Sequence, residues 1–217
     1  MFVGHYGLAL AAKRVTPRTS LGTLFLAAQL VDLVWPMLLL AGIERVRIVP
    51  NENPFLRLSF EWYPWTHSLV TDLCWGLVAG MVYFVARRDK RGAVVVGLLV
   101  VSHWVLDFVT HVPDLPIYPG GPVVGLGLWR SFIGTVVVEA ILFGVGGAMY
   151  GRVARPADRT GRYAFLALVA VLAVIYFANA YFPLPPDERS IAWGALAAWV
   201  FPLFGWWVDR HRTAEPA

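Results

Sequence analysis

Long apolar stretches alternate with short polar connections along the whole chain. A helix that crosses the hydrocarbon core of a bilayer needs about 20 mainly apolar residues. Stretches of this kind recur six times, at residues 21–43, 62–86, 92–111, 131–150, 163–183 and 190–208. The pattern therefore predicts an all-α fold, a polytopic transmembrane helix bundle of about six spans that forms one integral-membrane domain over residues 1–217.

The segments outside these spans differ in character. Residues 1–12 are apolar but too short to span, and no basic segment precedes them as in a signal peptide, so we expect a short interfacial or re-entrant helix. Residues 44–61 form a polar outer loop, and residues 112–122 form a rigid outer loop because proline and glycine dominate them. The tail, residues 209–217, is expected to fray.

Composition supports the membrane interpretation. Hydrophobic residues make up 58% of the chain, charged residues 15%, and the mean hydropathy is +0.62. Soluble domains carry about 25% charged residues, so the sequence excludes a soluble enzyme and a disordered chain. Cys74 is the only cysteine, which excludes an intramolecular disulfide, and we expect it to be a buried, inert thiol.

The basic residues predict an orientation. Cytoplasmic loops of membrane proteins carry an excess of lysine and arginine. Thirteen of the 18 basic residues lie on alternate connections, namely Lys13, Arg14, Arg18, Arg87, Arg88, Lys90, Arg91, Arg152, Arg155, Arg159, Arg162, Arg210 and Arg212. We therefore expect a multi-pass protein of the cell (inner) membrane with both termini in the cytoplasm. The net charge of +4 then reflects orientation in the lipid bilayer, and no nucleic-acid partner is expected.

Acidic residues inside the spans are the first sign of chemistry. Each of the first four spans contains one acid, in order Asp32, Asp72, Asp107 and Glu139, and no span contains lysine or arginine. Four unpaired acids at membrane depth would cost on the order of 10 kcal/mol. Protonation, a charged histidine or a bound metal could offset this cost. The two uncharged spans within 163–208 are expected to be scaffold.

The histidines favour the metal. His103, Asp107 and His111 are spaced by four residues, so they share one face of a helix. A single His–Asp pair in a protein core more often only forms a mutual hydrogen bond. Three such residues on one face favour a metal site. The helical rise places the acids of the other spans at a similar depth. The expected metal ligands are His5, Asp32, His67, His103, Asp107 and His111.

This ligand set predicts the type of metal. Mixed imidazole and carboxylate ligands suit zinc, manganese, iron or nickel better than calcium or magnesium. A structural zinc site is usually closed by four ligands, so the larger number here fits an open or two-metal site. We expect a divalent metal, with zinc first and manganese or iron as alternatives.

Several short motifs carry a family resemblance. They are Gly4-His5, Ala-Gln-Leu-Val-Asp ending at Asp32, Thr66-His67-Ser68, and Ser102-His103 with Asp107 four residues later, followed by a Pro/Gly loop. Over residues 1–140 the chain thereby resembles the predicted membrane-bound metal-dependent hydrolases, small polytopic proteins of the bacterial inner membrane. It differs from them at Leu33 to Trp35, where a second aspartate is common, at Pro64-Trp65, where Arg-Gly is common, and at His111, where a small polar residue is usual.

The resemblance implies an integral-membrane metal-dependent hydrolase. In that case Asp72 or Glu139 would act as the general base or orient a ligand. Arg130, at the outer mouth, would pair with an anionic headgroup or anchor the chain at the interface. The depth of the site suggests a lipid or lipid-linked substrate.

Two other functions fit the same residues. Chains of intramembrane Asp, Glu and His also serve proton relays, so a proton- or metal-ion-coupled transporter is one alternative. A structural membrane subunit, whose polar residues hold the helices together, is the other.

Overall fold

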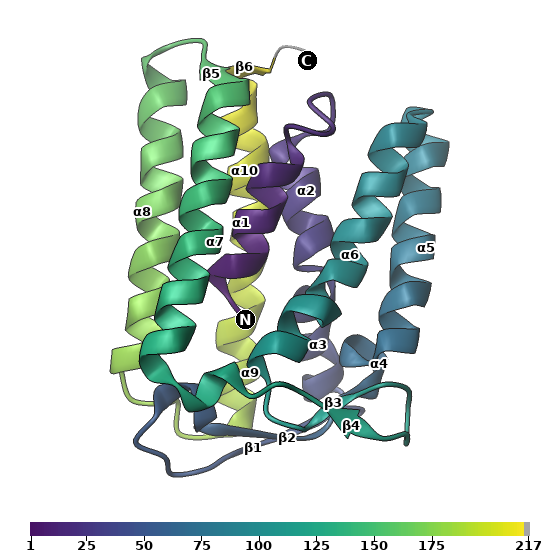
Figure 1. Ribbon diagram of the computed structural model, residues 1–217, viewed down its shortest axis with the longest axis vertical. Helices are drawn as coiled ribbons and strands as arrows, with labels where there is room; N and C mark the ends of the chain where they lie inside the picture. Colours follow the sequence, from purple (N-terminus) through teal and green to yellow (C-terminus); the bar gives the residue numbers. More distant parts are fainter. Residues whose placement is uncertain (215–217) are drawn as a thin grey trace.

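The computed structural model describes residues 1–214 and is a bundle of helices with short sheets at its ends (Figure 1). The helices long and apolar enough to cross a membrane are α5 (Leu69–Arg87), α6 (Lys90–Thr110), α7 (Phe132–Val153), α8 (Arg159–Tyr181) and the segment Glu188–Arg210. A bent pair, α2 (Leu21–Ala28) and α3 (Leu30–Leu40), makes a sixth if it counts as one span. The prediction of a multi-pass helical bundle is confirmed.

Two of the spans are interrupted rather than continuous. The helices α2 and α3 are bent by 53° about Gln29. The last span consists of α9 (Glu188–Leu196), a 3-10 turn and α10 (Val200–Arg210). The two interruptions pair, because α2 packs against α10 while α3 packs against α9. Each half of the first broken span therefore packs against a different half of the last broken span.

The predicted span 62–86 is also divided. A single turn, α4 (Pro64–His67), precedes α5, and Ser68 between them is extended with ψ of 148°. The Ser68 hydroxyl accepts a hydrogen bond from the N–H of Thr71, which caps the first turn of α5. This break leaves His67 at the end of a separate turn.

The N-terminal helix α1 (Val3–Ala12) lies inside the bundle. Figure 1 shows the start of the chain at mid-height between the other helices, and seven of the ten residues of α1 are buried. It packs on α7 so closely that a Cβ on Gly146 would clash with the backbone of Gly7. Residues 1–12 therefore form a helix inside the bundle, which agrees with the re-entrant alternative better than with the interfacial one.

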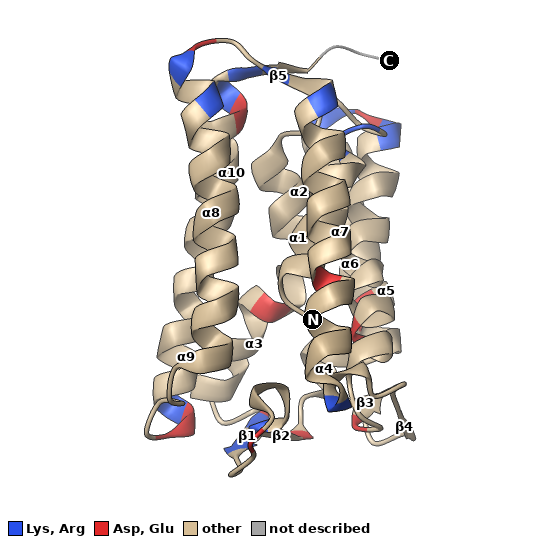
Figure 2. Cartoon of the chain, turned by 60° about the vertical axis from the view of Figure 1, so that its left-hand side comes forward, with Lys and Arg blue, Asp and Glu red and all other residues tan. Residues whose placement is uncertain are grey.

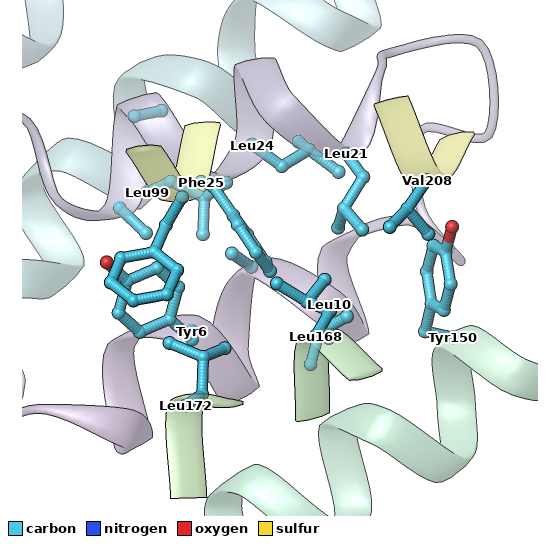
Figure 3. Close-up of a cluster of buried hydrophobic side chains, with 14 of the residues drawn as sticks. Tyr6, Leu10, Leu21, Leu24, Phe25, Leu99, Tyr150, Leu168, Leu172 and Val208 are labelled. Carbon is cyan, nitrogen blue, oxygen red and sulfur yellow. The ribbon is translucent and has the colours of Figure 1, made fainter. Parts of the chain in front are cut away.

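The main core joins the first helices to the last ones. Tyr6 and Leu10 of α1 pack with Phe25 of α2 and with Leu168 and Leu172 of α8, all at most 1% exposed (Figure 3). Each fully buried side chain of this size contributes about 1.5–3 kcal/mol to stability. The uncharged spans therefore hold α1 in place by apolar packing.

Short sheets close both ends of the bundle. The strands β1 (Arg45–Ile48) and β2 (Leu58–Trp62) form an antiparallel hairpin within the predicted polar loop, and β3 (Leu115–Pro116) pairs with β4 (Val123–Val124). A 3-10 turn, Pro54–Leu56, lies in the connection between β1 and β2. Another 3-10 turn, Leu128–Arg130, precedes α7.

The predicted fraying of the tail is wrong for residues 209–214. The strand β6 (Arg212–Ala214) pairs with β5 (Ala154–Pro156). The Arg212 guanidinium donates to the carbonyls of Ala154 and Gly161 and lies 4.9 Å from the Phe165 ring centroid. His211 Nδ1 lies 2.8 Å from an Asp158 carboxylate oxygen, and this hydrogen bond lowers the pKa of Asp158. Residues 215–217 of the predicted tail lie outside the described residues.

Charge is concentrated at the two ends of the bundle. Figure 2 shows lysine and arginine at both ends, most of them at the end that carries β5, and only a few acidic positions between. This is the arrangement of a chain whose middle lies in hydrocarbon.

Cys74 is exposed, so the prediction of a buried thiol is wrong. It lies on α5, a helix whose packing is almost entirely against α6. The rest of the α5 surface is therefore left for the surroundings of the bundle, with exposed side chains such as Leu77 and Met81.

Candidate metal centre

Imidazoles and carboxylates from four helices converge inside the bundle. Two groups of residues each bring their potential ligand atoms within 4.8 Å of one another. The first is His5 of α1 with His103 and Asp107 of α6, and the second is Asp32 of α3 with His67 of α4 and again His103. His103 belongs to both groups, so they form one centre.

The imidazoles all present Nε2 to the carboxylates. Asp107 lies centrally, with Oδ1 3.2 Å from Nε2 of His5 and Oδ2 3.3 Å from Nε2 of His103. Asp32 Oδ1 lies 3.1 Å from Nε2 of His67 and 3.6 Å from that of His103. His111, which directly follows α6, has Nε2 3.7 Å from Asp107 Oδ2. The structure thus brings all six sequence-predicted ligands together.

A backbone carbonyl fixes the tautomer of His103. Its Nδ1 lies 2.8 Å from the carbonyl oxygen of Ala28, which can only accept, so the proton is on Nδ1. In a continuous helix that carbonyl would bond the N–H of Asp32, and the break between α2 and α3 frees it. Nε2 of His103 is buried and makes no hydrogen bond. In neutral His103, a lone pair therefore faces two carboxylates.

A chain of hydrogen bonds fixes His67 in the same way. The Thr66 hydroxyl donates to Glu44 Oε2 at 2.7 Å and lies 2.7 Å from Nδ1 of His67. Because the hydroxyl has only one hydrogen, His67 must supply the proton of the second bond. In neutral His67, Nε2 therefore keeps a lone pair, and it lies 3.1 Å from Asp32 Oδ1. Burial raises the pKa of Glu44, while hydrogen bonds from Thr66 and Trp65 favour its ionised form.

A carboxylate holds His111. Nδ1 of His111 lies 2.9 Å from Asp114 Oδ1 and 3.3 Å from the Tyr63 hydroxyl. The Tyr63 hydroxyl also donates to Asp114. The carboxylate accepts from Nδ1, so in neutral His111 the Nε2 lone pair again points inward. Metal-bound histidines in proteins are usually held in this way by an oxygen on their other nitrogen.

Glu139 holds the helix that carries His5. Its carboxylate accepts hydrogen bonds from the N–H groups of Phe2 and Gly4, at 2.8 and 3.1 Å, and so caps α1. His5 stacks on His103 with ring centroids 3.8 Å apart. The α-amino group of Met1 lies 2.5 Å from Asp107 Oδ1 and places one positive charge in the cluster. Glu139 belongs to neither ligand group.

The other two predicted site residues lie apart from the ligand groups. Asp72 is fully buried on α5, and neither of its carboxylate oxygens has a hydrogen-bond partner among residues 1–214. His103, Asp107 and Asp32 act on it electrostatically. Arg130 is exposed in the 3-10 turn before α7, and its neighbour Trp129 packs on His111 with ring centroids 4.0 Å apart.

The centre is accessible at one point. The Asp32 side chain is 33% exposed, whereas those of the four histidines and Asp107 are at most 5% exposed. A molecule entering from outside the bundle would therefore meet Asp32 first.

The residues that orient the imidazoles are missing from the sequence prediction. In the sequence, Glu44 and Asp114 are acidic residues of predicted loops, with nothing to connect them to a histidine. The Ala28 carbonyl belongs to the backbone, so no residue type indicates its role. Only Thr66, adjacent to His67 in the motif, offers a local hint.

Comparison of the chain with protein-family models, curated proteins and solved structures finds no match.

Proposed function

We propose that the chain is an integral-membrane metal-dependent hydrolase. His67, His103 and Asp107 would hold a divalent metal, with Asp32, His5 or His111 completing one or two sites. One observation carries the proposal: three imidazoles whose Nδ1 atoms donate to fixed oxygens turn their Nε2 lone pairs toward two carboxylates. Lone pairs and anions repel unless a cation lies between them, and zinc, manganese and iron accept this ligand set.

The charges around the centre support a cation. The acids Asp32, Asp72, Asp107 and Glu139 lie within the bundle, and the one positively charged partner that contacts them among residues 1–214 is the Met1 amino group. Three negative charges therefore remain for protons or a metal to neutralise. A bound divalent ion meets this need without forcing protons onto the histidines.

The chemistry follows from the residues around the ligands. A bound metal would supply a Lewis acid and a water of lowered pKa. Asp72, buried without a hydrogen-bond partner among the described residues, is the candidate to accept a proton nearby. Glu139 would act as a positioning residue because it caps the helix of His5. Hydrolysis itself rests on the family resemblance, and the partly exposed Asp32 side chain within the bundle favours a lipid or lipid-linked substrate.

The orientation belongs to the same proposal. The end of the bundle that carries β5, β6 and the α5–α6 turn holds most of the basic residues (Figure 2) and would face the cytoplasm of a cell with an inner membrane. In the N-terminal part of the chain, the segment proposed to face the cytoplasm is the connection around Lys13 and Arg18. Met1 itself is buried inside the bundle.

Metal content tests the proposal directly. We would purify the wild type, Asp107→Asn and His211→Gln in mild detergent without chelator and measure metals by mass spectrometry. We expect about one or two equivalents of zinc, manganese or iron in the wild type and at least a tenfold loss in Asp107→Asn. His211→Gln should keep the metal, because His211 lies at the end of α10, away from the centre.

Two results would overturn the proposal at different levels. A folded wild type that holds no metal and takes none up on addition would remove the metal centre. A metal-loaded protein that cleaves no ester, amide or phosphoester substrate would remove the hydrolase and leave a metal site of another kind.

A proton- or ion-coupled transporter is the second candidate, and Asp72 favours it. A fully buried acid without a hydrogen-bond partner is typical of proton relays in membranes. Proton flux into liposomes that contain the protein, lost in Asp72→Asn while the metal content stays unchanged, would support this function over hydrolysis.

A further inference from the structure

We propose that a groove at the basic end of the bundle binds one anionic glycerophospholipid. The groove encloses a cavity of about 480 Å³ between α2, α5 and α6, with Trp206 of α10 at its side. This volume is within the range of small-molecule pockets in proteins. No residue of the candidate metal centre lines it, so the proposal depends neither on the metal nor on hydrolysis.

The groove results from the way the helices diverge. The hairpin of α5 and α6 leans away from α2 toward the basic end (Figure 1). The Tyr83 hydroxyl lies 2.9 Å from that of Thr19 and ties the end of α5 to the turn before α2. The floor is closed by Val96, which is 4% exposed. The cavity is thus bounded by a hydrogen bond between α5 and the turn before α2 and by a buried apolar side chain of α6.

Its walls suit an acyl chain. Leu26 of α2 and Leu30, at the start of α3, face Ala79 and Val82 of α5 across the groove. Polar groups occur only toward the mouth, where Ser20 and Thr23 precede or begin α2. A lipid tail lying here would bury apolar surface on both walls.

Its mouth suits a phosphate. Arg18 and Arg87 both line the cavity, and neither forms an ion pair with any residue from 1 to 214. Among residues 1–214, the acids at this end have other partners: Asp89 caps α6 through Gly92, Asp158 lies 2.8 Å from His211, and Asp209 pairs with Lys13 at 2.6 Å. The two guanidiniums therefore offer positive charge with no acid of the described chain lining the groove beside them.

These features favour a lipid of the bilayer with a negative headgroup. Basic pockets between transmembrane helices on the cytoplasmic side bind such headgroups. Guanidinium groups donate paired hydrogen bonds to phosphate oxygens, which orders the headgroup as well as attracting it. A lipid of no net charge would gain the apolar contacts but leave the second arginine without a counter-charge.

Lipid affinity of the full chain tests this site. We would measure binding of dioleoyl-phosphatidylglycerol and dioleoyl-phosphatidylcholine to the detergent-purified protein by native mass spectrometry. The double variant Arg18→Gln/Arg87→Gln should bind phosphatidylglycerol about 25-fold more weakly, at about fivefold for each arginine. The control Arg14→Gln/Arg91→Gln removes the same charge from exposed arginines outside the groove and should bind nearly as the wild type does.

A second variant tests the groove without changing charge. Ala79→Phe places a ring between the walls and should reduce phosphatidylglycerol binding at least tenfold while both arginines remain. Equal affinity of the wild type for the two lipids, equal losses in the two double variants, or full binding by Ala79→Phe would each overturn the proposal.

Discussion

At the scale of single residues, the partners of the Nδ1 atoms decide what the histidines can do. The carbonyl of Ala28, the hydroxyl of Thr66 and the carboxylate of Asp114 each accept from one imidazole. A neutral imidazole has one donor and one acceptor nitrogen, so fixing the donor also fixes where the lone pair points. The ability to bind metal is therefore set by atoms that do not touch the metal position.

Glu44→Gln should weaken metal binding although Glu44 is not among the expected ligands. The amide oxygen of the new side chain would still accept hydrogen bonds from the N–H groups of Trp65 and Thr66. The amide NH2 group would then take the position of Oε2 and donate to the Thr66 hydroxyl. That hydroxyl would then donate to Nδ1 of His67 and move the imidazole proton to Nε2. We expect a loss of about 10- to 100-fold in metal affinity, measured by competition with a chelator of known affinity.

Thr66 offers the matched control for that change. Thr66→Ser keeps the hydroxyl and should bind metal as the wild type does, whereas Thr66→Val should behave like Glu44→Gln. If Thr66→Val retained full affinity, the relay from Glu44 to His67 would have no role in metal binding.

At the scale of elements, the interruptions of the helices build the centre. The bend after α2 frees the Ala28 carbonyl and places Asp32 in the first turn of α3. The break at Ser68 leaves His67 on its own turn. Straight helices would present these side chains along separate lines, and only the breaks let them meet His103.

The contact between α1 and α7 should be the most sensitive of the helix contacts. Gly146→Ala would drive a Cβ into the backbone of Gly7, and such overpacking typically costs about 1–3 kcal/mol. The shift of α1 would also move His5. We therefore expect a lower free energy of unfolding, measured by denaturant titration in detergent, and a reduced metal content.

The same helix supplies the control. A Cβ on Gly147 would meet nothing within 4 Å, so Gly147→Ala should be neutral or stabilise the helix by about 0.5–1 kcal/mol. Equal destabilisation by the two alanines would show that the effect does not come from the contact with α1.

At the scale of the whole molecule, the two ends of the bundle differ in charge and should face different compartments. The test uses a Cys74→Ser background with single cysteines at Glu52→Cys in the hairpin of β1 and β2 or at Thr160→Cys near the start of α8, both exposed positions. A membrane-impermeant maleimide should label the first in intact cells and the second only after permeabilisation. The reverse pattern would contradict the proposed orientation.

The sequence by itself determined where the apolar segments lie, that they are helical, and that His103, Asp107 and His111 share one face. These features depend on residue type and spacing, which act over one or two turns of a helix. It also identified the acids and histidines that meet in the interior, because charged groups in hydrocarbon need partners wherever they occur.

Only the tertiary structure decided where the helices break, that α1 enters the bundle, and that Glu44 reaches Thr66. Each of these features depends on contacts between segments that are distant in the chain. The two halves of the first span, α2 and α3, pack on α10 and α9, and α1 packs on α7. Cys74 is exposed because α5 packs almost entirely on α6, and the groove beside Arg18 opens because the hairpin of α5 and α6 leans away from α2. The spacing of apolar residues determines which face of each helix is apolar. Contacts between distant segments determine which of these faces are buried.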